Sequence, residues 1–284
     1  MTILHRTRLL LGAALLALSA VPATAQLADQ IEGDRLQSWR VQTGNHLRLC
    51  VYPSSTTIEF DKAVGQAIAE RLLLSPRFID LPEGYGLDGE YAAEDFYVKL
   101  VNECDAALTM TIVPNAYPED FTVTRPIAAF SYILVSDDPA ITALTDIPAT
   151  ESLGGGVMTY GDYILGAHIR NLPKERQWRR IPFGTNEQML GRLLDGTIAA
   201  MVIFAPDYQQ LLSRHADLAD KLHVAPLKVE LTSFLNRGAV LLAQNTFLRS
   251  EMDAAITDMM SDGTIDRILK DLGMDKYPVR AGGI

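Results

Sequence analysis

The residue types that most often perform catalysis or bind metals are scattered along this chain. The histidines after residue 25 are His46, His168, His215 and His223, and they do not have the spacing of a metal site. The sequence contains no Gly-x-Ser-x-Gly nucleophile motif, no phosphate-binding loop and no His-Glu-x-x-His motif. These patterns predict a protein that is not an enzyme and that uses neither a metal nor a cofactor.

A run of three glycines at residues 154–156 is the nearest approach to a nucleotide-binding motif. The third glycine position of the dinucleotide fingerprint holds Thr159, so the run is predicted to be a turn or a closely packed strand start. Asp162 and Tyr163 follow, near an expected helix start, where backbone amides could hold an anionic ligand. Asp162 could equally be an ordinary helix N-cap.

A cluster of basic residues surrounds a tryptophan. Five cations fall within eleven positions, at Arg170, Lys174, Arg176, Arg179 and Arg180. On an acidic protein such a cluster is usually a solvated surface. The alternative is a docking patch for an acidic partner, formed by Arg176, Arg179 and Arg180 and anchored by Trp178, because Trp and Arg dominate interface energetics.

Residues 1–25 have the pattern of an export signal. Arg6 and Arg8 precede the apolar run 9–21, and Ala-Thr-Ala at 23–25 is a typical cleavage site. Such a run would extend about 20 Å as a helix, which is shorter than the roughly 30 Å bilayer core. We therefore expect a periplasmic protein, cleaved near Ala25, with no later membrane span.

The charge balance limits the partners. Without Arg6 and Arg8 the chain has 23 basic and 35 acidic residues, a formal charge of −12. A surface of that charge repels nucleic acid and anionic lipid, so neither is expected as a partner.

The two cysteines, Cys50 and Cys104, both follow the export signal. In an oxidising compartment an even pair usually forms a disulfide. A bond between them would close a loop of about 55 residues, which would stabilise the fold by about 4 kcal/mol in the chain-entropy model. The alternative is two buried thiols.

Strands and helices are expected to alternate twice along the chain. Thr56 and Glu59 form a capping box, which predicts that the first helix opens there. The first set comprises strands at 47–52, 78–81 and 105–110, with helices between them. The second set comprises a helix at 163–170, a strand at 178–181, a helix at 187–194 and a strand at 198–204. A strand at 239–242 and helices at 247–260 and 264–272 close the chain, with Gly273 as a C-cap. This order predicts two α/β units with mostly parallel sheets.

Four segments together resemble family 3 of the periplasmic solute-binding proteins. Residues 47–53 resemble its first strand, 103–111 its third strand, 193–200 a helix–turn–strand of its second lobe, and 261–266 its C-terminal helices. The resemblance implies the two-lobed type II periplasmic-binding-protein fold, with a ligand cleft between the lobes. By that analogy lobe one takes residues 27–134, lobe two takes 135–229, and 230–284 returns to lobe one.

The resemblance also implies a set of cleft residues, and two charges are missing from it. Amino-acid binders of the family have an Arg after the third strand, but residues 112–120 contain no Arg or Lys. The Asp that receives the ammonium group is replaced by Phe204. Because a zwitterion without charged partners is costly to bury, we expect no binding of simple amino acids. The expected cleft residues are Tyr52, Ser54, Ser55, Thr109, Thr111, Asp162, Tyr163 and Phe204.

Cys50, Cys104-Asp105 and Thr124-Arg125-Pro126 are similar to a particular group, the J-type accessory proteins of PQQ-dependent methanol dehydrogenases. That resemblance implies a non-enzymatic accessory protein, with a segment of the quinoprotein dehydrogenase in the cleft. The alternative is a substrate-binding receptor of an ABC transporter, with a small non-amino-acid ligand and an inner-membrane permease as partners. Both hypotheses stay open at the level of sequence.

Overall fold

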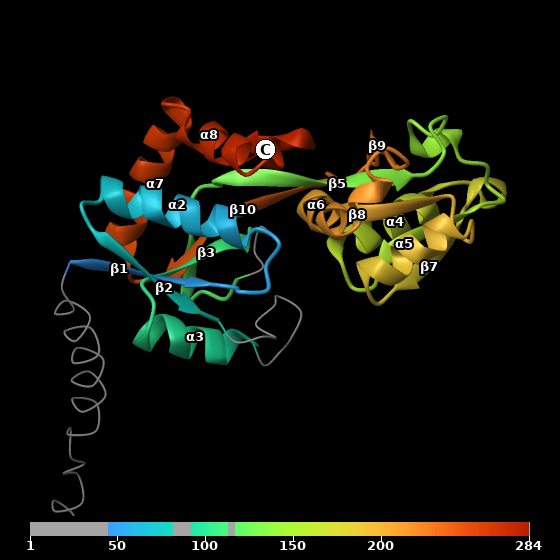
Figure 1. Ribbon diagram of the computed structural model, residues 1–284. Coiled ribbons are helices and arrows are strands. Elements are labelled where there is room, and N and C mark those ends of the chain that lie inside the picture. Colours follow the sequence, from blue (N-terminus) through green and yellow to red (C-terminus); the bar gives the residue numbers. More distant parts are fainter. Residues whose placement is uncertain (1–44, 82–91, 113–116, 284) are drawn as a thin grey trace, which may run out of the picture. The chain divides into compact units, whose positions relative to one another are not determined.

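In the part of the chain that the structure describes, eleven strands form one continuous sheet system, with helices on both of its faces (Figure 1). The structure is a computed structural model that describes residues 45–81, 92–112 and 117–283. The predicted export signal lies outside these residues. The main strand order is β2-β1-β3-β10-β5-β8-β6-β7, while β4 pairs with β10, and β9 and β11 pair with β5.

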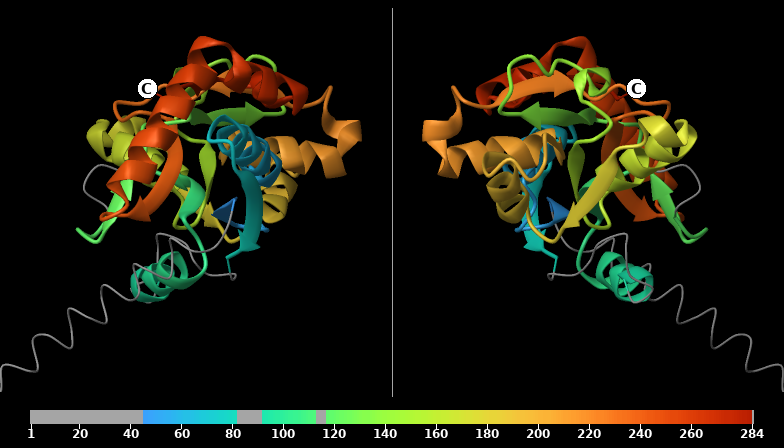
Figure 2. Two further views of the ribbon diagram at one scale, coloured as in Figure 1. Left: turned by 90° about the vertical axis from the view of Figure 1, so that its left-hand side faces the viewer. Right: turned by 90° about the vertical axis from the view of Figure 1, so that its right-hand side faces the viewer.

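Lobe one is built from the first α/β set and the chain end. Its parallel strands are β1 (His46–Val51), β2 (Ser75–Asp80) and β3 (Ala106–Thr111). Its helices are α2 (Ile58–Arg71), α3 (Ala92–Asn102), α7 (Thr246–Ser261) and α8 (Thr264–Asp271). Figure 2 shows α3 on the opposite side of the sheet from α7 and α8, so hydrophobic side chains are buried on both faces, as expected for parallel strands.

Lobe two repeats this arrangement with the middle of the chain. Its parallel strands are β6 (Ser152–Gly156), β7 (Arg179–Phe183) and β8 (Ala200–Phe204). Its helices are α4 (Tyr160–Asn171), α5 (Asn186–Leu194) and α6 (Ala205–Arg214). Separate hydrophobic cores lie on the two faces of this sheet as well.

Two nine-residue strands connect the lobes. The first part of β5 (Ala128–Ser136) pairs with β10 (Phe234–Leu242) and β11 (Val279–Ala281), and its second part pairs with β8 and β9 (His223–Pro226). β10 also pairs with β3 and β4 (Phe121–Val123). Side chains on β5 and β10 therefore stand where elements of both lobes converge.

The predicted disulfide is present. Cys50 in β1 and Cys104 just before β3 are bonded and fully buried, with 5.7 Å between their Cα atoms. Because β1 and β3 are adjacent parallel strands, the bond joins neighbours in the sheet. It lies in the core between the sheet and α3.

The structure corrects two predicted helix starts and adds a helix. α2 begins at Ile58 with Thr57 as N-cap, and the Thr56–Glu59 capping box is absent because Thr56 bonds elsewhere. α4 begins at Tyr160, three residues earlier than predicted. α6 was not predicted, although Pro206 in its first turn is a favourable start. Gly273 follows α8 at a φ of 64°, as its predicted C-cap role requires.

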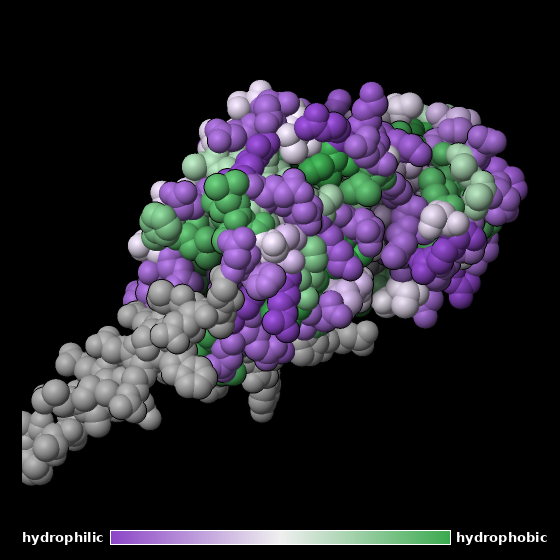
Figure 3. All heavy atoms as spheres, turned by 60° about the vertical axis from the view of Figure 1, so that its left-hand side comes forward, coloured by the Kyte–Doolittle hydropathy of each residue, from purple (hydrophilic) through white to green (hydrophobic). Residues whose placement is uncertain are grey.

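The face in Figure 3 is covered mainly by hydrophilic side chains, with hydrophobic ones in small groups. Among the described residues, none of the helices combines the length and hydrophobicity that a bilayer crossing requires.

Candidate functional site

A guanidinium group lies at the junction of the two lobes. Arg237 stands opposite Thr111 in the β10–β3 register, and its Nη1 donates to Thr111 Oγ1 at 2.7 Å. Its Nε is sealed from solvent and has no hydrogen-bond partner. Burial lowers the pKa of Arg237, and the acidic and phenolic groups of Asp61, Tyr117, Tyr132 and Asp207 oppose that effect. Arginine stays charged in proteins, so the junction holds a partly buried cation whose Nε donor is buried without a partner.

Asp61 of α2 is the first of the acidic groups beside Arg237. Its side chain is 1% exposed. Oδ2 accepts a hydrogen bond from Thr57 Oγ1 at 3.3 Å, while Oδ1 is buried without a partner. Burial raises its pKa to about 7, and the Arg237 charge is the main influence in the other direction. The carboxyl is therefore protonated in part of the molecules at neutral pH.

Asp207 links lobe two to lobe one. It lies in the first turn of α6, where Oδ1 accepts from Thr56 Oγ1 at 2.7 Å and Oδ2 from Asn186 Nδ2 at 3.4 Å. Burial raises the pKa of Asp207, and the bond from Thr56 is the largest opposing influence. Thr56 follows β1, so this bond joins segments 151 residues apart.

Aromatic rings continue the contact between the lobes. Successive rings lie within 5.3 to 6.2 Å of each other in the order Phe60, Phe130, Phe204, Tyr132, Tyr160 and Tyr163. Phe204, at the end of β8, packs against the cores of both lobes. Tyr132 of β5 lies against the first turn of α4, where a Cβ on Gly161 would come within 2.4 Å of its ring.

We call Thr56, Asp61, Thr111, Tyr132, Asp207 and Arg237 the interlobe site. Its members come from α2, β3, β5, β10 and α6 and from the loop after β1. The site combines one cation, two carboxyls with raised pKa values and partly or fully buried hydroxyls. Such an arrangement can bind a carboxylate at Arg237 and a donor group at Asp207.

Some of the predicted cleft residues lie at this site. Thr111 bonds Arg237, and Ser55 Oγ lies 2.9 Å from the hydroxyl of Thr57, which bonds Asp61. Phe204 contacts Tyr132. Tyr52 is partly buried in the same loop, whereas Ser54 is exposed.

Thr109 also lies at this site, because it is fully buried and its hydroxyl interacts with the carboxyl of Asp61. Its φ of 41° belongs to an irregularity in the β3–β10 register. The last two predicted cleft residues, Asp162 and Tyr163, have different surroundings. Asp162 is not the N-cap of α4, because Thr159 accepts the bond from the Asp162 amide. Asp162 instead pairs with Arg180 at 2.5 Å. Tyr163 is 59% exposed and contacts Tyr160.

The proposed aromatic anchor of the basic patch is wrong. Trp178 is buried in the core beside α4, its Nε1 donates to the carbonyl of Ile147 at 3.0 Å, and its ring stacks on His168. Trp can be buried where its N–H finds an acceptor, as Trp178 does here. Its side chain therefore contributes to the core of lobe two and is not available to a partner at the surface. Arg176 and Arg179 are exposed, as expected of a solvated face.

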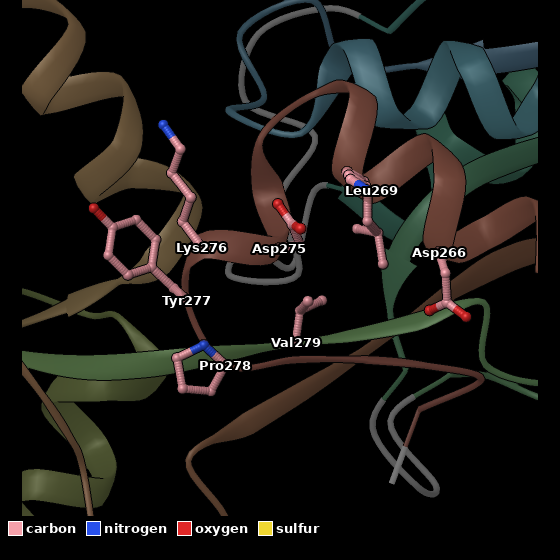
Figure 4. Close-up of a pocket in the computed structure, with 8 residues that line it drawn as sticks. Asp266, Leu269, Asp275, Lys276, Tyr277, Pro278 and Val279 are labelled. Carbon is pink, nitrogen blue, oxygen red and sulfur yellow. The ribbon is translucent and has the colours of Figure 1, made fainter.

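A surface pocket of about 570 Å³ is lined by none of the residues of the interlobe site (Figure 4). It is lined by α8 and the segment after it, including Asp266, Lys270, Asp275 and Lys276. Its charges are balanced, which does not favour one class of ligand. In the described part of the chain no group of His, Cys, Asp and Glu side chains could hold a metal ion.

No known protein family and no curated protein matches this sequence. Solved structures do match its fold. A substrate-binding protein of a polar amino acid ABC uptake transporter from Streptococcus thermophilus is 15% identical, with 83% of this chain and 90% of that chain covered and a TM-score of 0.61. Substrate-binding domain 2 of GlnP from Lactococcus lactis is 18% identical, with 80% and 95% covered and a TM-score of 0.59.

A third similar structure is an ABC uptake transporter substrate-binding protein from Streptococcus pneumoniae with bound histidine. It is 14% identical, with 83% of this chain and 95% of that chain covered and a TM-score of 0.55. At these identities the likeness concerns the fold. The chain has the two-lobed α/β fold of type II periplasmic binding proteins, as the sequence predicts.

Proposed function

We propose that this protein is an exported receptor that binds a small carboxylate-bearing solute between its lobes and delivers it to an ABC permease. The observation that carries the proposal is the buried Nε of Arg237, which has no partner although Nη1 of the same group bonds Thr111. A buried donor on a charged group without a partner is costly, and a bound carboxylate would satisfy it.

The charges of the interlobe site favour a zwitterion. Arg237 offers a cation to a carboxylate, and Asp207 offers an acceptor to an ammonium group. The expectation that amino acids do not bind rests on two missing charges, an Arg after β3 and an Asp at the position of Phe204. Arg237 supplies that cation from β10, and Asp207 lies three residues beyond Phe204. Amino acids and related zwitterions are therefore the solute class we propose.

The alternative role, as an accessory protein of a quinoprotein dehydrogenase, stays a prediction of the sequence resemblance. Two of the similar structures named above belong to ABC uptake transporters, and the third is a substrate-binding domain, according to their names. They support the receptor function by analogy of fold.

The test is calorimetry with L-glutamine, L-arginine and L-histidine on three proteins: the parent, Arg237→Gln and Arg214→Gln. We expect at least one ligand to bind the parent, and Arg237→Gln to weaken it about a hundredfold, since a charged hydrogen bond contributes about 1.5–3 kcal/mol. Arg214 is an exposed arginine of α6 that pairs with Glu187, so its replacement should leave affinity unchanged.

Two results would count against this function. One is that the parent binds none of the three amino acids. The other is that Arg237→Gln binds as tightly as the parent while its melting temperature shows that it is folded.

A further inference from the structure

We propose that Asp61 takes up a proton when a carboxylate binds Arg237, so that solute capture is coupled to pH. The inference rests on the proposed function, because it assigns a regulator to the same anion site. It begins from two interacting groups that each have a buried atom without a hydrogen-bond partner, Oδ1 of Asp61 and Nε of Arg237.

The geometry keeps Asp61 from neutralising Arg237 fully. Hydrogen bonds of the two groups go to threonines, from Thr57 Oγ1 to Asp61 Oδ2 and from Arg237 Nη1 to Thr111 Oγ1. The two groups nevertheless interact through space, since each changes the pKa of the other. A carboxylate arriving at Arg237 would therefore meet a second negative charge at Asp61 whenever Asp61 is ionised.

The sign of the effect follows from the ionisation of Asp61, whose pKa of about 7 lies well above its ordinary value. Below that pH Asp61 is neutral and no longer offsets the charge of Arg237, so a carboxylate binds most strongly. Above it Asp61 is ionised and opposes the carboxylate, so affinity falls as pH rises. By linkage, a carboxylate at Arg237 raises the pKa of Asp61 further, and the change in affinity is at most about tenfold per pH unit for one proton.

Three other titratable groups face Arg237, namely Tyr117, Tyr132 and Asp207. Burial raises the pKa of Tyr117 and of Tyr132 to about 12, so both phenols stay neutral near pH 7. Asp207 of α6 also faces Arg237, and burial raises its pKa too. Asp207, however, accepts bonds from Thr56 and Asn186, which favour its ionised form. Asp61 is 1% exposed whereas Asp207 is only partly buried, so Asp61 is the better proton acceptor.

The experiment uses acetate as a carboxylate probe without an ammonium group. Carbon-13 NMR of labelled aspartate carboxyls follows Asp61 between about pH 5.5 and 9, in sodium acetate and in sodium chloride of equal ionic strength. Nitrogen-15 signals of the Arg237 Nε–H report anion binding independently. Asp61→Asn and Asp207→Asn identify the two carboxyl signals.

We expect the Asp61 transition to move upward by about half a pH unit or more in acetate. The response of Arg237 to acetate should weaken above pH 7 in the parent and lose most of this pH dependence in Asp61→Asn. An unchanged Asp61 transition despite a response of Arg237 to acetate would overturn the coupling alone. A silent Arg237 at every pH would overturn the anion site, and with it the proposed function. If Asp61→Asn does not fold, the shift of the Asp61 transition in the parent still tests the coupling.

Discussion

Replacing both cysteines by alanine is expected to lower the free energy of unfolding by about 4 kcal/mol. The bond between Cys50 and Cys104 spans 54 residues, and restraining a loop of this length in the unfolded chain accounts for that magnitude in the chain-entropy model. The decrease in the free energy of unfolding is expected to be large because the bond joins β1 to β3 in a core that also includes Leu81, Phe96 and Leu100.

Urea denaturation of the parent and of the Cys50→Ala/Cys104→Ala variant measures the effect. Reductant should bring the parent close to the variant and leave the variant unchanged, which separates the bond from the packing of the two side chains. A parent whose midpoint is insensitive to complete reduction would show that the bond contributes little to stability.

Local patterns in the sequence predict most of the fold. Period-3.6 hydrophobic residues mark α5, α7 and α8, and apolar runs mark β3 and β8, because each of these elements buries one face or both faces in a core. The start of α2 is predicted wrongly for a physical reason. The hydroxyl of Thr56 that could cap this helix bonds Asp207 instead, a contact that no local pattern contains.

The interlobe site was much harder to predict from sequence. Its charged members, Asp61, Asp207 and Arg237, belong to elements far apart in the chain. The predicted strand at 239–242 stopped short of Arg237, although residues 234–242 read as one strand once Gly238 is allowed within it. The available signal was a charged residue next to an apolar run, because Arg237 comes just before the half of β10 that is fully buried. The family resemblance places the cation in residues 112–120, which contain no Arg or Lys, and so does not point to β10.

Replacing Gly161 by alanine is the second substitution with a large expected effect. An added Cβ would lie 2.4 Å from two ring carbons of Tyr132, so that the ring must move. Tyr132 is 7% exposed and is held by Phe204 and Tyr160, which leaves little room for a shift. Overpacking of this kind costs about 1–3 kcal/mol. Because Tyr132 belongs to the interlobe site, solute affinity should fall as well.

The matched control is Gly191→Ala in α5, where no atom lies within 4 Å of the added Cβ. Alanine is favoured over glycine in helices by up to about 1 kcal/mol, so this variant should be slightly more stable than the parent. Thermal and urea unfolding should therefore move in opposite directions for the two glycines. If the clash with Tyr132 is the cause, Gly161→Ala should cost much less in a Tyr132→Ala background, as a double-mutant cycle would measure. If Gly161→Ala lowers the free energy of unfolding equally in both backgrounds, the clash with Tyr132 is not the cause, and the strain lies in the backbone of α4.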